Sequence, residues 1–445
     1  MERTRTSIAL SNLRAVVILV VLGFHSVLAY LGFLGPSAFT FDSPPYEWRA
    51  FPIVDAHRWF GFDLLCASQD VYLMSLMFFL SALFTWSSLA RKRRRKFLTD
   101  RLLRLGVPFA FALIVVMPLA LYPVYRMTAT DPGLGAYAQH YLALPFWPNG
   151  PMWFIWQLLA LAIVAAGVHR WAPHWVDSLT RWSSTAANHP GRYFIGLLAA
   201  SALAYVPLAL AFTPWAWSDH GPFAIQLCRP LLYAVYYFAG LGVGAYGIER
   251  GLLAPEGMLA RRWLGWFAGA FVSLLLWMGL TGLALTYRTA TPLALQVAVG
   301  ISFALACTSG CFFVMAGCLR FATRPSRIFD GLANSAFGMY LLHYVFIVWL
   351  QYALLGVALF AVAKAMIVFA AAVLLAWATT TILRSLPFGS RLIGAVPSVG
   401  VGAILAGRLQ PVVAGMRTTA GAAIRRMPLG TDHSPFVEVR DAIDP

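Results

Sequence analysis

The chain has 445 residues, of which 60% are hydrophobic and only 11% are Asp, Glu, Lys or Arg. Soluble domains carry about 45–50% apolar and about 25% charged residues, so this composition excludes an ordinary soluble enzyme. The net charge of +16 would suit a nucleic acid partner. However, the arginine clusters flank apolar blocks, which indicates membrane topology and no nucleic acid partner.

The apolar residues fall in blocks of about 20, the length that crosses the hydrocarbon core of a bilayer. This pattern predicts an all-α, polytopic transmembrane helix bundle of about ten spans embedded in the lipid bilayer. Residues 1–385 form the expected transmembrane domain, and residues 386–445 form the expected cytoplasmic tail. The expected spans lie near residues 13–34, 64–89, 106–126, 152–169, 193–213, 231–249, 263–286, 296–319, 333–355 and 361–383.

The distribution of basic residues between the expected loops predicts the orientation. If the amino terminus is cytoplasmic, every inside loop carries more Arg and Lys than its outside neighbours, as the positive-inside rule requires. An even number of spans also leaves the carboxyl terminus in the cytoplasm, and we expect a multi-pass protein of the cell inner membrane. The apolar segment 393–407 is expected to be a partial span, a re-entrant helix or an interfacial helix.

The densest basic cluster, at residues 91–104, has two interpretations. It is expected to determine topology and to contact anionic lipid. The alternative is that it collects a phosphate-bearing substrate from the cytoplasm. Arg101 and Arg104, three residues apart at the mouth of the third span, are best placed for that second role.

Five cysteines, an odd number, do not make a disulfide framework. Cys307, Cys311 and Cys318 fall at spacings of four and seven, which places them on one stripe of a helix. No CxxC motif or nearby histidine accompanies them, so we expect them to pack a helix interface and expect no metal site.

Titratable side chains inside the expected spans are few, and each is a candidate functional residue because charge is costly to place in a bilayer. Arg14 and His25 lie eleven residues apart in the first span. On a helix this spacing is about 20° from a whole number of turns and rises about 16 Å. The two side chains are therefore expected on one stripe, with Arg14 at the interface and His25 near mid-membrane.

Two interpretations of this pair stay open. In the first, the Arg14 guanidinium binds a phosphate and the buried His25 imidazole is a general base. Their separation is comparable to the pantetheine arm of coenzyme A, so a donor held near Arg14 would present its thioester close to His25. In the second, Arg14 anchors the topology and His25 hydrogen-bonds a neighbouring helix.

Three further spans carry candidate residues. Tyr340 and His343 share a helix face near the middle of the ninth span, and His343 is either functional or a hydrogen-bonded bundle histidine. Lys364 is expected to extend its amine outward to the interface, with a catalytic or substrate-anchoring amine as the alternative. Asp70 either ends a helix or steadies a histidine.

Aromatic residues crowd the expected outer face. An interfacial belt explains most of them, but residues 146–153, which include Trp153, are denser than a belt needs. Because aromatic planes stack on sugar rings, we expect a carbohydrate or other acceptor site there. The set comprises Tyr46, Trp48, Trp59, Tyr137, Tyr141, Phe146, Trp147, Trp153, Trp156, Trp215 and Trp217.

Five segments, taken in order, resemble the acyltransferase 3 family of integral membrane O-acyltransferases, and among its branches the glucan-succinylating type. The resemblance covers about residues 10–385. The first segment, residues 12–25, has an Arg and a His separated by ten residues, and the second, residues 77–84, is similar to the family's FFLSG segment but has Ala82 in place of Gly. The third is the arginine-rich segment 97–109. The fourth, residues 150–156, is similar to the family's GxLWFL element, and the fifth is the YLLH of residues 340–343.

This resemblance implies an acyl-CoA co-substrate that arrives from the cytoplasm and an acceptor hydroxyl, usually of a sugar, on the outer side. It implies that His25 is the essential histidine and that Arg14 is its partner for the donor. Lys364 falls where members of the family often carry a lysine. The implied activity is O-acylation of a glycan or cell-envelope glucan.

Two mechanisms and two rival functions remain at this point. His25 acts either as general base in direct transfer or as nucleophile in an acyl-histidine relay. Tyr340, His343 or Ser81 is expected to donate to the developing oxyanion. The rival functions are a transporter or flippase of an envelope carbohydrate or lipid-linked sugar, and a non-catalytic scaffold; the chain shows no inverted repeat that would favour the transporter.

Overall fold

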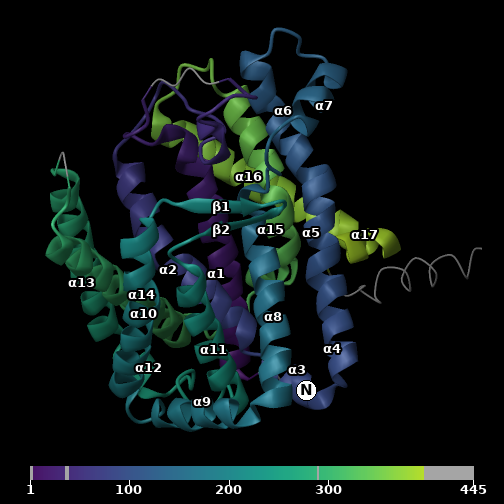
Figure 1. Cartoon of the computed structure of the whole chain (residues 1–445). Helices are drawn as coiled ribbons and strands as arrows, with labels where there is room; N and C mark the ends of the chain where they lie inside the picture. Colours follow the sequence, from purple (N-terminus) through teal and green to yellow (C-terminus); the bar gives the residue numbers. More distant parts are fainter. Residues whose placement is uncertain (1–3, 36–39, 288–289, 395–445) are drawn as a thin grey trace, which may run out of the picture. The chain divides into compact units, whose positions relative to one another are not determined.

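A computed structural model of the chain describes residues 4–35, 40–287 and 290–394. These residues form a bundle of helices with one two-stranded sheet (Figure 1). The main helices are α1 (Arg5–Val27), α2 (Gly61–Ala82), α3 (Thr85–Arg91), α4 (Arg94–Arg101), α5 (Val107–Phe111), α6 (Met117–Thr128), α7 (Leu134–Leu142), α8 (Trp153–Trp171), α9 (Pro173–Thr185), α10 (Pro190–Phe212), α11 (Pro230–Tyr246), α12 (Met258–Arg261), α13 (Trp263–Leu285), α14 (Leu293–Phe321), α15 (Arg327–Ala353), α16 (Ala361–Ser385) and α17 (Pro387–Leu392).

Shorter elements complete the described chain. The 3₁₀ turns are η1 (Leu28–Tyr30), η2 (Glu47–Arg49) and η5 (Gly150–Met152), and the π-helical turns are η3 (Leu102–Gly106) and η4 (Ala112–Val116). The strands β1 (Trp217–His220) and β2 (Phe223–Gln226) pair antiparallel, with Trp217 opposite Gln226.

The polytopic, all-α prediction is confirmed. Among the described residues, nine helical segments are long and apolar enough to cross a membrane. The remaining expected span, 231–249, corresponds to α11, whose 17 residues match the lower end of the spanning range. The nine segments are Arg5–Tyr30, Gly61–Arg91, Arg94–Thr128, Gly150–Trp171, Pro190–Phe212, Trp263–Leu285, Leu293–Phe321, Arg327–Ala353 and Ala361–Ser385.

The first helix begins earlier than the apolar block that predicted it. α1 starts at Arg5, and the Thr4 side chain caps it by accepting a hydrogen bond from the Ser7 amide. A hydropathy window detects the apolar block and misses the polar turns that precede it. Arg14 therefore lies more than two turns inside the helix instead of at its start.

The third span is irregular because of its prolines. The π-helical turns η3 and η4 contain Arg104 and Ile114, which lie four residues before Pro108 and Pro118. A proline has no N–H for the carbonyl four residues earlier, so the regular ladder is interrupted at these points. The widened turn η3 carries Arg104, one of the predicted donor-binding residues.

Close helix packing holds α2, which carries two candidate residues, against α11. A Cβ atom added at Gly240 would lie 2.2 Å from the Phe79 carbonyl oxygen, and one at Gly244 would lie 1.8 Å from that of Leu83. Only glycine allows this approach of two backbones. In Figure 1, α1 runs beside α15, while α13 packs on α14 at the edge of the bundle.

The cysteine stripe lies where α14 faces α2. The Cys307 thiol is 3.3 Å from Ser75 Oγ, and the Cys311 thiol is 3.6 Å from the Tyr72 carbonyl oxygen. Both cysteines are buried, as expected for residues that pack a helix interface, while Cys318 is half-buried.

The described part of the tail is short. The last long helix, α16, ends at Ser385, and α17 follows it. Most of the apolar segment 393–407 lies outside the described residues, so its membrane placement stays a prediction.

Candidate active site

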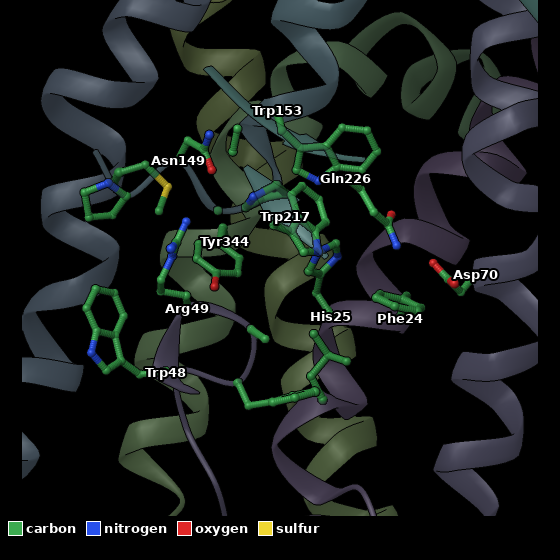
Figure 2. Close-up of a pocket in the computed structure, with 18 of the residues that line it drawn as sticks. Phe24, His25, Trp48, Arg49, Asp70, Asn149, Trp153, Trp217, Gln226 and Tyr344 are labelled. Atoms are coloured by element: carbon green, nitrogen blue, oxygen red, sulfur yellow. The ribbon is translucent and has the colours of Figure 1, made fainter. Parts of the chain in front are cut away.

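A cavity of about 540 Å³ lies beside the carboxyl-terminal half of α1, and we call it the aromatic cavity. Figure 2 shows His25 near its middle, with Asp70 and Arg49 on opposite sides of this residue. Its other lining residues include Phe24, Tyr46, Glu47, Trp48, Asn149, Trp153, Trp217, Gln226, Arg229 and Tyr344.

A second cavity, of about 470 Å³, gathers the three arginines that were predicted to bind a donor, and we call it the arginine cavity. Arg14, Arg101 and Arg104 all line it. Within residues 4–35, 40–287 and 290–394, no carboxylate forms an ion pair with any of the three. Like charges that share a cavity repel one another, so an anion is favoured there. Ser81, from α2, lines the same cavity.

The two cavities have two lining residues in common, Val21 and Tyr340. Val21 lies two turns beyond Arg14 on α1 and one turn before His25. The Tyr340 hydroxyl donates a hydrogen bond to the Pro151 carbonyl oxygen. These two side chains therefore form a partition between the arginine cavity and His25.

The histidines predicted in separate spans meet. The ring centroids of His25 and His343 lie 4.8 Å apart, with an interplanar angle of 69°. His25 Nδ1 is 2.9 Å from the Val21 carbonyl oxygen, and His343 Nδ1 is 2.6 Å from that of Tyr340. Because a carbonyl only accepts, these contacts assign the proton of each neutral ring to Nδ1 and leave each Nε2 with its lone pair.

The two imidazoles differ in how far a molecule in the aromatic cavity can reach them. His343 is fully buried, and its Nε2 has no hydrogen-bond partner in the described part of the chain. His25 is half-buried and lines the aromatic cavity. Its Nε2 is therefore the one available to a molecule in that cavity, with His343 packed behind it.

Asp70 forms a bidentate ion pair with Arg229. Arg229 Nη1 lies 2.9 Å from Asp70 Oδ1, and Arg229 Nη2 donates to the other carboxylate oxygen. The Arg229 side chain is 7% exposed and the Asp70 side chain 42% exposed, so the carboxylate keeps an open side. Both expectations for Asp70 are wrong, because it lies inside α2 and pairs with this arginine instead of a histidine.

These features agree with the comparison to known families. A family model described as an acyltransferase domain, Acyl_transf_3, matches residues 7–381. The chain belongs to the acyltransferase 3 family. No curated protein and no solved structure matches the chain. The protein is therefore a membrane acyltransferase, and residues from α1, α2, α8 and α15 line its two cavities.

Lys364 of the acyltransferase lines neither cavity. Its ammonium lies 2.6 Å from Asp55 Oδ2, and both side chains are buried. The expected outward extension of Lys364 is wrong, because Asp55 supplies a counter-charge inside the protein. Asp55 belongs to the same loop as residues 45–51, which line the aromatic cavity.

Several residues of the acyltransferase's aromatic cavity were not singled out from the sequence. Arg229 and Arg49 were counted only as outside-loop charges, although basic residues are disfavoured on that side and were a signal in themselves. Arg49 is 2.7 Å from Asp219 Oδ1 and lies 4.0 Å from the Phe146 ring centroid. Asn149 lies in the segment 146–153, where an acceptor site was expected, whereas Gln226 and Tyr344 carried no signal in the sequence.

The members of the predicted aromatic set have different surroundings. Tyr46, Trp48, Trp153 and Trp217 line the aromatic cavity. Others stay on the surface, as Trp215 does with 81% exposure, which suits an interfacial belt.

Proposed function

We propose that this acyltransferase moves an acyl group from cytoplasmic acyl-CoA to a hydroxyl of a glycan or cell-envelope glucan on the outer side of the inner membrane. The observation that carries the proposal is that a basic cavity and an aromatic cavity meet one helical turn from His25. A donor and an acceptor of different chemistry would thus reach one imidazole from two directions.

The arginine cavity supports coenzyme A as the donor. Guanidinium groups bind phosphate oxygens through two parallel hydrogen bonds, and Arg14, Arg101 and Arg104 have no carboxylate partner among the described residues. The helical rise of about 16 Å from Arg14 to His25 is comparable to a pantetheine arm. Phosphates bound at the arginines would leave the thioester at the level of His25.

The aromatic cavity supports a sugar acceptor. The ring centroids of Trp153 and Trp217 lie 5.7 Å apart, and these rings offer planes on which a sugar ring can stack. The open side of the Asp70 carboxylate can accept hydrogen bonds from hydroxyls. The resemblance to the glucan-succinylating branch favours a glucan among sugar acceptors.

The proposed chemistry is direct transfer with His25 as general base. Nε2 takes the proton of the acceptor hydroxyl while its oxygen attacks the thioester carbonyl, and the C–S bond of the tetrahedral intermediate then breaks. The proton held by His25 passes to the departing thiolate. A positioned base of this kind contributes about 10²–10⁴-fold to the rate.

Of the three expected oxyanion donors, two already donate hydrogen bonds to the protein itself, and Ser81 lies on the donor side. The Tyr340 hydroxyl already donates to the Pro151 carbonyl oxygen, and His343 Nδ1 is committed to the Tyr340 carbonyl oxygen. Ser81 lines the arginine cavity, on the donor side of Val21 and Tyr340. Its hydroxyl can therefore donate to the thioester oxygen while the donor is bound there, before the acyl group reaches His25.

The proposal is tested with purified protein in lipid nanodiscs, labelled acetyl-CoA or succinyl-CoA, and a mixture of linear and cyclic glucan oligosaccharides. We expect protein-dependent transfer of label to the glucan, and its loss in H25A. In sealed proteoliposomes, movement of unmodified glucan without acyl transfer would support the transporter or flippase instead.

A further inference from the structure

The partition between the two cavities consists of two buried side chains. Val21 is 3% exposed and Tyr340 is 5% exposed, and each lines both cavities. Val21 lies four residues before His25, so it stands about 6 Å below the imidazole along the axis of α1. Val21 and Tyr340 are the two lining residues that the cavities share, so a molecule that moves directly from the arginine cavity to His25 passes beside them.

Both sides of this passage are rigid. Valine in a helix keeps one strongly preferred χ1 rotamer, because its branched Cβ crowds the preceding turn. Tyr340 is tethered at its hydroxyl by the Pro151 carbonyl oxygen, and its ring packs on Phe154 at 5.7 Å and on His343 at 5.6 Å between centroids. Close-packed interiors do not yield readily to an extra methylene group.

We infer that Val21 and Tyr340 select the acyl group by size and restrict the donor to short acyl chains. The inference rests on the proposed function, in which the donor is held at Arg14, Arg101 and Arg104. The acyl group is the leading end of a thioester that approaches from those arginines. The acyl group therefore has to pass the partition before the carbonyl reaches His25. Each added methylene group increases its steric conflict with the rigid Val21 and Tyr340 side chains.

The substitution that tests this selection is Val21→Ala, which removes two methyl groups from the passage. One methylene group in an apolar pocket discriminates by about 10–200-fold. In V21A we expect the ratio of kcat/KM for hexanoyl-CoA to that for acetyl-CoA to rise by about tenfold or more. In Val21→Ile, which adds a methylene group, the same ratio should fall.

The measurement uses the full chain in nanodiscs with acetyl-, butyryl-, hexanoyl- and octanoyl-CoA, and the same glucan oligosaccharides as acceptor. The readouts are released coenzyme A thiol and label on the glucan. Val20→Ala is the matched control, because Val20 is the neighbouring valine of α1 and lines neither cavity. The V20A ratio should equal that of the unsubstituted protein.

The outcomes separate this inference from the proposed function. If the unsubstituted protein transfers label but V21A and V20A show the same chain-length ratio, the size selection is overturned while the function stands. If the unsubstituted protein transfers label from none of the four donors and not from succinyl-CoA either, the function fails and the inference fails with it. If it transfers label from succinyl-CoA alone, the function stands and selection by chain length is overturned. If V21A does not fold, an unchanged ratio in V21I is the result that overturns the selection.

Discussion

The Lys364 ammonium lies 2.6 Å from Asp55 Oδ2, with the side chains only 0% and 1% exposed. This buried ion pair joins α16 to the loop that contains residues 45–51 of the aromatic cavity. Asp55 Oδ1 also accepts a hydrogen bond from the His57 amide at 2.8 Å. The pair thus anchors the loop that forms one side of the proposed acceptor site.

Lys364→Met should destabilise the protein strongly, because it leaves the Asp55 carboxylate buried without a partner. Removing one member of a buried pair costs about 3–5 kcal/mol. We expect a lower midpoint of thermal unfolding for K364M in nanodiscs, and partial recovery in the double variant K364M/D55N. The control is Lys96→Met, whose exposed pair with Asp100 contributes about 0–1 kcal/mol. Equal midpoints for K364M and K96M would contradict the role of the buried pair.

His25→Gln should lower acyl transfer by about 10²–10⁴-fold, because glutamine cannot accept the proton of the acceptor hydroxyl. The expected readout is label on the glucan, with intact membrane insertion and an unchanged elution profile. His140→Gln serves as the control, since His140 is exposed, pairs with Asp42 and lines neither cavity. Full activity in H25Q would refute the assignment of the base.

Direct transfer and the acyl-histidine relay differ in a protein-bound intermediate. With direct transfer, protein mixed with labelled acyl-CoA in the absence of glucan and quenched in denaturant should carry no covalent label. Label that is present in the unsubstituted protein and absent in H25Q would establish the relay. Intact-mass measurement of the same samples would show the added acyl group.

Arg14→Ala should mainly weaken the binding of acyl-CoA, because a hydrogen bond to a charged group contributes about 1.5–3 kcal/mol. We expect the KM for acyl-CoA to rise by about 10-fold or more, with the KM for glucan unchanged. Arg95→Ala removes an exposed charge from the same basic cluster without touching either cavity. A KM for acyl-CoA that rises equally in R14A and R95A would indicate general attraction of anions in place of a donor site.

Arg229→Lys should impair acceptor binding and leave donor binding intact. Lysine keeps the charge but cannot form the bidentate contact that orients Asp70 in the aromatic cavity. The expected result is a higher KM for glucan at an unchanged KM for acyl-CoA, while Arg126→Lys, an exposed arginine outside both cavities, changes neither. A shift in the KM for acyl-CoA alone would place the pair on the donor side.

Much of the site was predictable where the signal is local. Arg14 and His25 share one helix, so their common stripe follows from helical periodicity. Arg101 and Arg104 could be singled out from the sequence by their position at the mouth of a span, but only the structure shows that they share a cavity with Arg14. By contrast, the start of α1 differed from the prediction, because polar turns carry no hydropathy signal.

The order of apolar and charged residues along the chain is enough to predict a polytopic helix bundle and the titratable side chains of its spans. Both predictions depend on local composition, because a segment that crosses the bilayer has to be apolar and helical over about 20 residues. The partners of these side chains emerge only from the folded structure: His343 for His25, Arg229 for Asp70, and Asp55 for Lys364. Each pair joins residues far apart in the chain, and it forms only when packing sets the rotation and depth of two segments against each other.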